Sequence, residues 1–289
     1  MATAREWLAG SRPRTLPAAL APVLVGTGAA QLAAGANLAR AALAAGVALA
    51  LQVGVNFAND YSDGVRGTDL ERVGPMRLTA SGAARPEQVL AAALGSFGVA
   101  ALLGLWLVSL TGVWWLLAVG AAAVAAAWFY TGGRRPYGYV GLGEVGVFVF
   151  FGLVATVGTT YTQVLQVPWP AWLGAVGTGL NACALLMANN LRDVPTDALA
   201  GKRTLAVRLG EHRARRLYGA ELLGALVAGA VCAAVAPWSL LVLLLALPVT
   251  LLSVTVLAGA RGRLLVPVLA GTGLLSLGYG ALLGLGLAL

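Results

Sequence analysis

Charged residues are scarce in this chain of 289 residues, and their scarcity excludes most soluble proteins. Asp, Glu, Lys and Arg make up 10% of the sequence, whereas they make up about 25% of an ordinary soluble domain. So few charged side chains cannot cover a water-facing surface. Hydrophobic residues reach 59%, which also excludes an intrinsically disordered chain. The composition predicts an all-α protein that crosses a membrane several times.

Cysteine and histidine are almost absent, which narrows the kinds of site that the chain can hold. The two cysteines, Cys183 and Cys232, lie in apolar runs without a CxxC spacing. Neither a disulfide framework nor a zinc site is therefore indicated. The single histidine, His212, excludes a His-rich metal site.

The N-terminus lacks the pattern of a secretory signal. Residues 1–14 contain three arginines and no apolar core. The apolar run that follows, from Leu16 to about Gly35, is longer than the roughly 7–15 residues of a signal core. We therefore expect this run to be the first membrane-spanning helix.

Apolar runs long enough to cross a bilayer recur along the whole chain. A spanning helix needs about 20 mainly apolar residues. By this measure we expect nine spans, near 15–34, 40–58, 88–110, 112–131, 141–162, 170–190, 214–235, 238–259 and 264–288. They form one domain over residues 1–289, and the many Gly and Ala residues allow the helices to approach closely.

Positive charge is distributed unequally between the two sides of these spans. Of the 19 Lys and Arg residues, 18 fall on connections that share one side, and Arg40 alone falls on the other. Cytoplasmic loops carry the excess of Lys and Arg. We therefore expect the N-terminus in the cytoplasm and the C-terminus outside. The protein would lie in the cell membrane, with membrane lipid as a partner. The net charge of +8 then needs no nucleic acid to explain it.

All five aspartates lie in two long polar connections on the positive side, at residues 59–87 and 191–213. We call residues 56–69 (NFANDYSDGVRGTD) box one and residues 189–203, which open NNLRDVPTD, box two. Both boxes contain Asn-x-x-x-Asp and both end a predicted span, so they resemble a weak internal duplication. Long loops in a compact bundle are usually functional.

Helical spacing places the polar residues of each box on one face. These residues are Asn56, Asp60 and Asp63 in box one, and Asn189, Asp193 and Asp197 in box two. Carboxylate oxygens suit Mg²⁺, which typically binds one or two carboxylates together with substrate phosphates. Helix capping could explain a single box. Two boxes at matching membrane depth favour a site that holds metal and diphosphate.

Cations and aromatic residues accompany the acids. Arg66 lies inside box one, and Lys202 and Arg203 follow the acids of box two; we expect all three to bind phosphate. Arg213, Arg215 and Arg216 are better explained by topology. A third connection on this side, residues 128–144, contains Tyr130, Arg134, Tyr137 and Glu144, which are candidates for binding an aromatic acceptor or an allylic cation. An interfacial aromatic belt, with Glu144 paired to an arginine, is the alternative.

With these boxes and connections, the chain resembles a known family, the UbiA-type intramembrane prenyltransferases. The resemblance covers essentially the whole chain, and its most specific parts are NFANDYSDGVRGTD and NNLRDVPTDALAGKRTLAVRLG. Tyr130-x-x-x-Arg134 looks like the family's Tyr-x-x-x-Lys element with Arg in place of Lys. The endings of both boxes and SRPRTLPAALAPVLVGT near the start look most like the branch that prenylates 1,4-dihydroxy-2-naphthoate in menaquinone synthesis.

The resemblance implies a fold, a reaction and a ligand set. The fold is a nine-helix bundle around a central cavity that opens to the cytoplasm. The reaction transfers a polyprenyl group from its diphosphate to the naphthoate, with loss of CO2 and diphosphate. Mg²⁺ would be bound by Asp60, Asp63, Asp69, Asp193 and Asp197. The diphosphate would also contact Asn56, Arg66, Asn189, Lys202 and Arg203.

One departure from the family leaves a ligand open. The second four-residue step from Asp60 falls on Gly64 rather than on an acid. The division of labour between Asp63 and Asp69 is therefore not decided by the sequence.

Alternatives remain for the acceptor and for the class of protein. The boxes would bind the donor, so another aromatic acceptor such as 4-hydroxybenzoate or a chlorin fits them equally well. A membrane transporter would place acids within its spans, but here they gather in connections at the span ends. A purely structural membrane protein would have no reason to gather every aspartate in two boxes.

Overall fold

The computed structural model describes residues 2–68 and 76–289. Within these ranges the regular structure is helical, as the composition predicts. The longer helices are α2 (Leu16–Ala33), α3 (Leu38–Arg66), α4 (Pro86–Thr111), α5 (Leu116–Phe129), α7 (Ala155–Val164), α8 (Trp169–Leu199), α10 (Glu211–Val231), α11 (Ala246–Leu257) and α12 (Leu265–Ala288). The short elements are α1 (Ala4–Gly10), α6 (Gly143–Val147) and α9 (Leu205–Leu209), with η1 (Pro13–Thr15), η2 (Tyr137–Val140), η3 (Phe148–Val154), η4 (Cys232–Ala234), η5 (Pro237–Leu245) and η6 (Gly262–Leu264).

Local signals in the sequence set the ends of the helix that carries box one. The side chain of Asn37 accepts a hydrogen bond from the Arg40 backbone N–H at 3.0 Å and so caps the start of α3. At the other end, Gly67 adopts φ 71°, a left-handed conformation that glycine reaches without a steric cost. Between them α3 runs for 29 residues. It therefore continues past the predicted end at residue 58 and holds box one in a helix as far as Arg66.

Eight helices are long and apolar enough to cross a membrane in the described part of the chain. The predicted span over residues 112–131 is different, because its helix α5 covers Leu116–Phe129 and has 14 residues. At 1.5 Å per residue this helix is about 21 Å long, which is less than the roughly 30 Å of the hydrocarbon core. The span count of nine is therefore not confirmed by helix length. The other predicted spans coincide with the long helical stretches.

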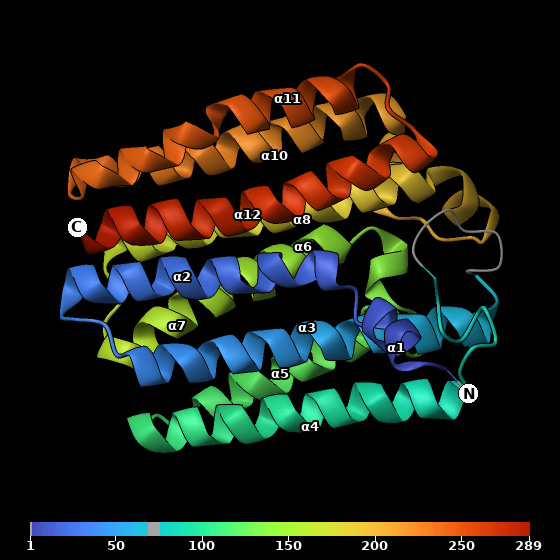
Figure 1. Cartoon of the computed structure of the whole chain (residues 1–289), viewed down its shortest axis with the longest axis horizontal. Coiled ribbons are helices and arrows are strands. Elements are labelled where there is room, and N and C mark those ends of the chain that lie inside the picture. The colour runs from blue at the N-terminus through green and yellow to red at the C-terminus, as the bar shows by residue number, and fades with distance from the viewer. Residues whose placement is uncertain (1, 69–75) are drawn as a thin grey trace.

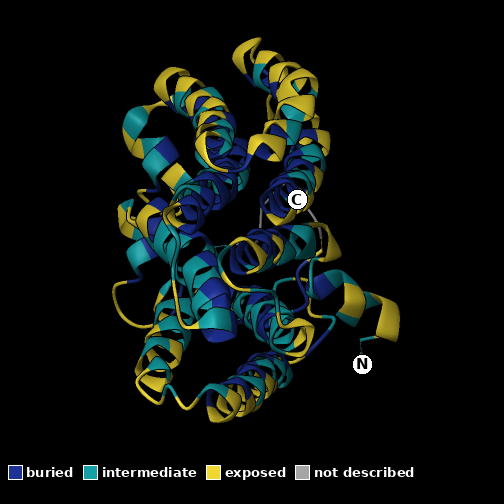
Figure 2. Ribbon diagram, turned by 90° about the vertical axis from the view of Figure 1, so that its left-hand side faces the viewer, coloured by how far each residue is buried: buried dark blue, intermediate teal, exposed yellow. Residues whose placement is uncertain are grey.

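Small residues let the helices of the bundle approach one another closely. A β-carbon added at Gly28 of α2 would lie 2.1 Å from the backbone oxygen of Gly284 in α12, and one added at Gly152 would lie 2.6 Å from the Cα atom of Gly179 in α8. Such contacts are possible where both partners are small, as in other membrane helix pairs. The largest group of buried apolar side chains belongs chiefly to α8, α10 and α12. Figure 2 shows buried residues facing the inside of the bundle and exposed residues on its periphery.

The two chain termini lie at opposite ends of the bundle (Figure 1). The N-terminus, α1 and the end of α3 that carries box one share one end, which we call the box end. Arg40 lies at the opposite end, where it donates hydrogen bonds to the backbone oxygens of Leu110, Thr162 and Gln163. These carbonyl groups belong to the last turns of α4 and α7, where a cation is favoured. Arg40, the one cation that the sequence places on the other side, is therefore bound by carbonyl groups at the ends of two helices.

Candidate functional site

A cavity of about 930 Å³ runs along the inside of the bundle. Residues of α2, α3, α4, α5, α7 and α8 line it, together with the η3 segment. Most lining side chains along the helices are apolar, and the charged ones come from the box end. Eight of the predicted site residues line this single cavity: Asn56, Asp63, Tyr130, Tyr137, Asn189, Asp193, Asp197 and Lys202. Helices far apart in the sequence therefore bring both boxes to one space.

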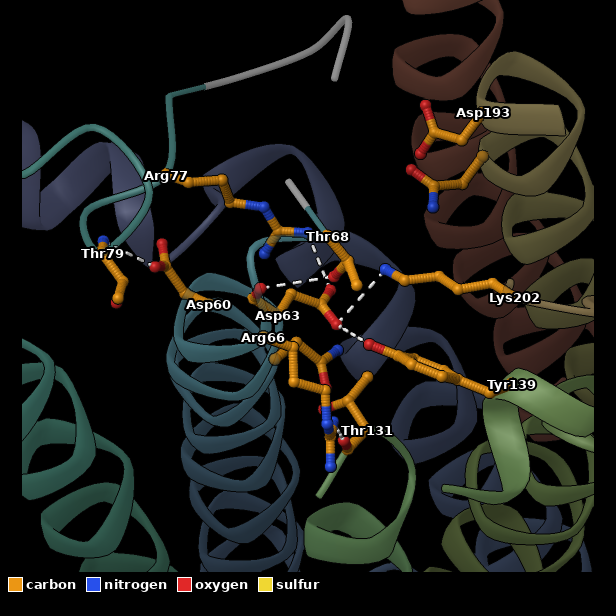
Figure 3. Close-up of polar contacts among 12 residues, drawn as sticks. Asp60, Asp63, Arg66, Thr68, Arg77, Thr79, Thr131, Tyr139, Asp193 and Lys202 are labelled. Atoms are coloured by element: carbon orange, nitrogen blue, oxygen red, sulfur yellow. Dashed lines mark hydrogen bonds and ion pairs between the residues drawn. The ribbon is translucent and has the colours of Figure 1, made fainter. Parts of the chain in front are cut away.

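Asp63 is the carboxylate of box one on which the most contacts converge (Figure 3). Its Oδ1 atom lies 3.3 Å from Nζ of Lys202, and its Oδ2 atom lies 3.8 Å from Nη2 of Arg77. The hydroxyl of Tyr139 donates a hydrogen bond to the same Oδ1 atom. These three partners come from three different connections, so Asp63 ties the box end together. Its side chain is 5% exposed, and burying a charged group is costly unless that group is paired and hydrogen-bonded.

Asp60 faces the turn formed by residues 77–80 rather than the cavity. Its Oδ2 atom accepts a hydrogen bond from the Leu78 backbone N–H at 2.8 Å, and its Oδ1 atom accepts one from the Thr79 backbone N–H at 2.9 Å. The residue is 1% exposed and is not among the cavity-lining residues. Asp60 therefore fixes the turn that carries Arg77. Its predicted role as a metal ligand stays a prediction.

The acids of box two lie in the last turns of α8, which continues through Pro195 to Leu199. Arg192 holds Asp193 through both carboxylate oxygens, with Nε and Nη2 each 2.7 Å from their acceptor. The same Nη2 atom donates to Oδ1 of Asn189 at 2.8 Å. A bidentate guanidinium fixes a carboxylate in orientation as well as in charge. Asn189, Asp193 and Asp197 all line the cavity.

The third connection supplies aromatic side chains to the same end of the cavity. The ring of Tyr139 has Lys202 Nζ 4.8 Å and Arg66 Cζ 5.5 Å from its centroid, both within the range of a cation–π contact. Tyr130 and Tyr137 meet edge to face with centroids 5.5 Å apart. Burial raises the pKa of Tyr137 to about 12. Burial and the neighbouring Asp63 carboxylate also raise the pKa of Tyr139, so both hydroxyls keep their protons at neutral pH.

Four other predicted residues lie around the cavity without lining it. Arg66 is exposed and donates hydrogen bonds to the backbone oxygens of Thr131 and Gly133. Arg134 and Arg203 are exposed. Glu144 is buried, and its Oε1 atom accepts a hydrogen bond from Asn190 Nδ2 at 3.0 Å. The predicted Asp69 lies outside the described residues.

Several residues at the site were not predicted as site residues. Asn59 lines the cavity and accepts a hydrogen bond from the Thr131 hydroxyl at 2.7 Å. Arg77 and Tyr139 contact Asp63, as described above. A signal for Asn59 is present in the sequence, because Asn59 and Asp63 form a second Asn-x-x-x-Asp frame that overlaps the one from Asn56 to Asp60.

The donor set at the cavity fits a divalent cation that is bound together with a phosphate ligand. Among residues 2–68 and 76–289, no group of three or more His, Cys, Asp or Glu side chains is arranged as a complete metal cage. Carboxylates from α3 and α8 nevertheless line one end of the cavity, with Lys202 beside them. Mg²⁺ rarely uses an all-protein cage and usually takes one or two carboxylates with substrate phosphates. The acids and cations present satisfy that requirement.

Comparison with known proteins identifies the family. The model of the UbiA prenyltransferase family matches residues 19–266. The chain belongs to the UbiA prenyltransferase family. Among relatives in this family, the 1,4-dihydroxy-2-naphthoate octaprenyltransferase of Mycobacterium tuberculosis is 54% identical over 95% of this chain and 94% of its own length. The enzyme of the same name from Escherichia coli is 40% identical over 77% of this chain and 74% of its own length.

Solved structures of UbiA homologs share the fold. A UbiA homolog from Aeropyrum pernix superposes with a TM-score of 0.66 at 18% identity, over 93% of this chain and 96% of that chain. A UbiA homolog from Archaeoglobus fulgidus, bound to DMAPP and Mg²⁺, gives a TM-score of 0.65 at 16% identity over 98% of this chain and 99% of that chain. The all-α membrane fold predicted from the sequence is therefore confirmed.

Proposed function

We propose that this protein is a polyprenyltransferase of menaquinone synthesis. It transfers a polyprenyl group from polyprenyl diphosphate to 1,4-dihydroxy-2-naphthoate, with loss of CO2 and diphosphate, and forms demethylmenaquinol. The names of the relatives at 54% and 40% identity support the choice of acceptor. The observation that carries the proposal is that Asp63, Asp193, Asp197 and Lys202 line one cavity although they come from separate boxes.

The acids of the two boxes would hold Mg²⁺ together with the diphosphate. Asp63 on one side and Asp193 and Asp197 on the other are the cavity-lining candidates. Asp60 is held by the turn at residues 77–80 and does not line the cavity, so Asp60 and Asp69 remain sequence predictions. When bound, the metal supplies Lewis-acid charge neutralisation to the leaving diphosphate. The Archaeoglobus fulgidus homolog bound to DMAPP and Mg²⁺ supports this choice of cofactor.

The cations at the box end would bind the diphosphate oxygens. Lys202 and Arg77 already lie beside Asp63, while Arg66 ends α3 and Arg203 lies between α8 and α9. Positive charge placed before the reaction stabilises the negative charge that develops as the bond between carbon and the diphosphate oxygen breaks. Asn56 and Asn189 line the same space and offer amide groups to the ligand.

The rest of the cavity would hold the prenyl chain and the aromatic acceptor. Its apolar lining excludes water, which protects an allylic cation from hydrolysis. Tyr130 and Tyr137 present ring faces and edges where such a cation or an aromatic ring would pass. Arg134 and Glu144 are the remaining candidates for the acceptor side. An electron-rich ring that attacks the allylic carbon needs no covalent nucleophile from the protein.

We further infer that the chain crosses the membrane nine times and that the cavity opens to the cytoplasm. Eight long helices and the shorter α5 together make nine passes. An odd number is supported by the two termini, which lie at opposite ends of the bundle (Figure 1). The excess of Lys and Arg at the box end supports a cytoplasmic N-terminus and an outside C-terminus.

A product assay in detergent tests the function. The purified protein is incubated with polyprenyl diphosphate and 1,4-dihydroxy-2-naphthoate, with Mg²⁺ or with EDTA, and mass spectrometry is used to detect a prenylated, decarboxylated naphthoquinol. We expect product with Mg²⁺ and none with EDTA. Product from 4-hydroxybenzoate alone would keep the family and reject the acceptor. If neither acceptor reacts and no diphosphate is released, the proposal fails and a transport function is the alternative to test.

A further inference from the structure

Tyr139 touches both acid boxes, although it belongs to neither of them. It lies in η2, within the third connection at the box end, and it lines the cavity. We propose that Tyr139 is a positioning residue that holds Asp63 and Lys202 in the arrangement that binds metal and diphosphate. This inference rests on the proposed function and adds a residue that the two boxes do not contain.

The hydroxyl of Tyr139 fixes the carboxylate of box one. It donates a hydrogen bond to Oδ1 of Asp63, the same atom that lies 3.3 Å from Lys202 Nζ. A hydrogen bond from a neighbouring side chain orients a metal-binding carboxylate, and removing such a partner typically lowers metal affinity about 10- to 100-fold.

The ring of Tyr139 fixes the lysine near the end of box two. Lys202 Nζ lies 4.8 Å from the ring centroid, and Arg66 Cζ lies 5.5 Å from it. Lys202 is 7% exposed, so its ammonium group is largely removed from water, where a cation–π contact is stronger than at an exposed site. The ring therefore contacts one cation from each box, and Lys202 is the one that also lies beside Asp63.

The backbone of Tyr139 holds the residue itself in place. Its carbonyl oxygen accepts a hydrogen bond from the Arg203 backbone N–H at 2.8 Å. This bond joins the third connection to the last residue of box two. Figure 3 shows the result, with Tyr139 and Lys202 reaching Asp63 from the elements opposite α3. Substitution of the side chain leaves this backbone bond available, so the effects of hydroxyl and ring can be measured separately.

Two variants separate these contributions. Tyr139→Phe removes the hydrogen bond to Asp63 and keeps the ring beside Lys202, whereas Tyr139→Leu removes both. Tyr161→Phe is the matched control, because Tyr161 lies in α7 and packs against Trp115 with ring centroids 5.9 Å apart, away from the boxes. The readout is the affinity for Mn²⁺ in the presence of inorganic diphosphate, measured by electron paramagnetic resonance on the full chain in detergent.

We expect Tyr139→Phe to weaken Mn²⁺ binding about tenfold, Tyr139→Leu to weaken it further, and Tyr161→Phe to leave it unchanged. In turnover assays, the KM for polyprenyl diphosphate should rise in Tyr139→Phe while the KM for the acceptor stays the same. Unchanged Mn²⁺ affinity in Tyr139→Phe would overturn the inference. So would equal increases of both KM values, because a general loss of structure has no preference for the donor.

A double-mutant cycle tests whether Tyr139 acts through Asp63. In the Asp63→Asn background, Tyr139→Phe should cause little further loss of Mn²⁺ affinity, because the partner of the hydroxyl is already altered. Full additivity would contradict the inference. The wild-type product assay distinguishes this failure from that of the proposed function. If the wild type makes no product, the function is wrong; if it makes product and Tyr139→Phe binds Mn²⁺ normally, only the role of Tyr139 is wrong.

Discussion

Box one and box two share a sequence frame, yet their matching aspartates are held in different ways. Asp60 accepts hydrogen bonds from two backbone N–H groups of a turn and does not line the cavity. Asp193, at the same position of the frame, is held by the side chain of Arg192 and lines the cavity. Among the described residues of box one, the cavity-lining acid is Asp63. The two boxes therefore correspond through Asn59 and Asp63 on one side and Asn189 and Asp193 on the other.

Helical spacing explains which residue pair of each box lines the cavity. Asn59 and Asp63 are separated by four residues, as are Asn189 and Asp193, so each pair shares one helix face. At 100° per residue, a shift of three residues amounts to about 300°, which is a net rotation of about 60° between the frame from Asn56 to Asp60 and the later frame. A rotation of this size is enough to direct Asp60 to the turn at residues 77–80 while Asp63 lines the cavity.

The largest loss of activity is expected when either Asp63 or Asp193 is replaced, since these are the cavity-lining aspartates that correspond between the boxes. Asp63→Asn and Asp193→Asn should each lower kcat/KM at least about 100-fold, because each removes a charge from the proposed metal and diphosphate site. Product formation by mass spectrometry measures the loss, with Tyr161→Phe as the control for handling in detergent. Near wild-type turnover in either variant would contradict a shared role of the two boxes in binding metal and diphosphate.

A smaller effect on turnover is expected from the unmatched acid. Asp60→Asn should lower kcat/KM about tenfold and destabilise the protein by about 1–3 kcal/mol, because an amide cannot accept both backbone hydrogen bonds in the same way. Thermal unfolding in detergent and the turnover assay are measured on the same preparation. A loss of turnover as large as in Asp63→Asn, with unchanged stability, would show that Asp60 binds the metal directly.

The guanidinium groups that contact Asp193 and Asp63 should contribute differently to the stability of the protein. Arg192→Gln breaks a bidentate pair whose side chains are 3% and 4% exposed, and breaking a buried pair typically costs about 3–5 kcal/mol. Arg77→Gln should cost less, because Asp63 keeps Lys202 and Tyr139. The melting temperatures of the two variants test this order. A larger decrease in melting temperature for Arg77→Gln than for Arg192→Gln would contradict it.

The smallest effect on catalysis is expected at the end of the bundle that lacks the boxes. Arg40→Gln loses hydrogen bonds to the helix-end carbonyl groups of Leu110, Thr162 and Gln163. We expect a loss of about 1–3 kcal/mol in stability and unchanged KM values for both substrates. A raised KM for the donor alone would show that this end of the cavity also contributes to binding.

Much of the fold was predictable because apolar runs and helices coincide in this chain. Hydropathy does not show where a helix starts, however. In the run at 112–131, Gly112 ends α4 in a left-handed conformation, and turns at residues 113–115 precede α5, so the helix is shorter than the apolar run. Pro195 was consistent with a connection, because proline removes a backbone donor, yet α8 continues through it to Leu199.

The site was predictable as far as composition and spacing reach. The gathering of every aspartate in two boxes indicated two regions that the structure brings to one cavity, and most of the residues predicted there line it. The overlapping frames of box one could not be separated, because spacing alone does not tell which helix face meets the cavity. Tyr139 and Arg77 were missed as site residues because their contacts with Asp63 join distant connections.

The central claim is that both boxes bind one metal and diphosphate unit across the cavity. The most direct measurement is Mn²⁺ binding in the presence of inorganic diphosphate, by electron paramagnetic resonance, for wild type, Asp63→Asn, Asp193→Asn and the double variant. We expect each single variant to bind Mn²⁺ at least about tenfold more weakly than the wild type, and the double variant to lose less than the two losses combined. Wild-type affinity in either single variant, or fully additive losses in the double variant, would contradict it.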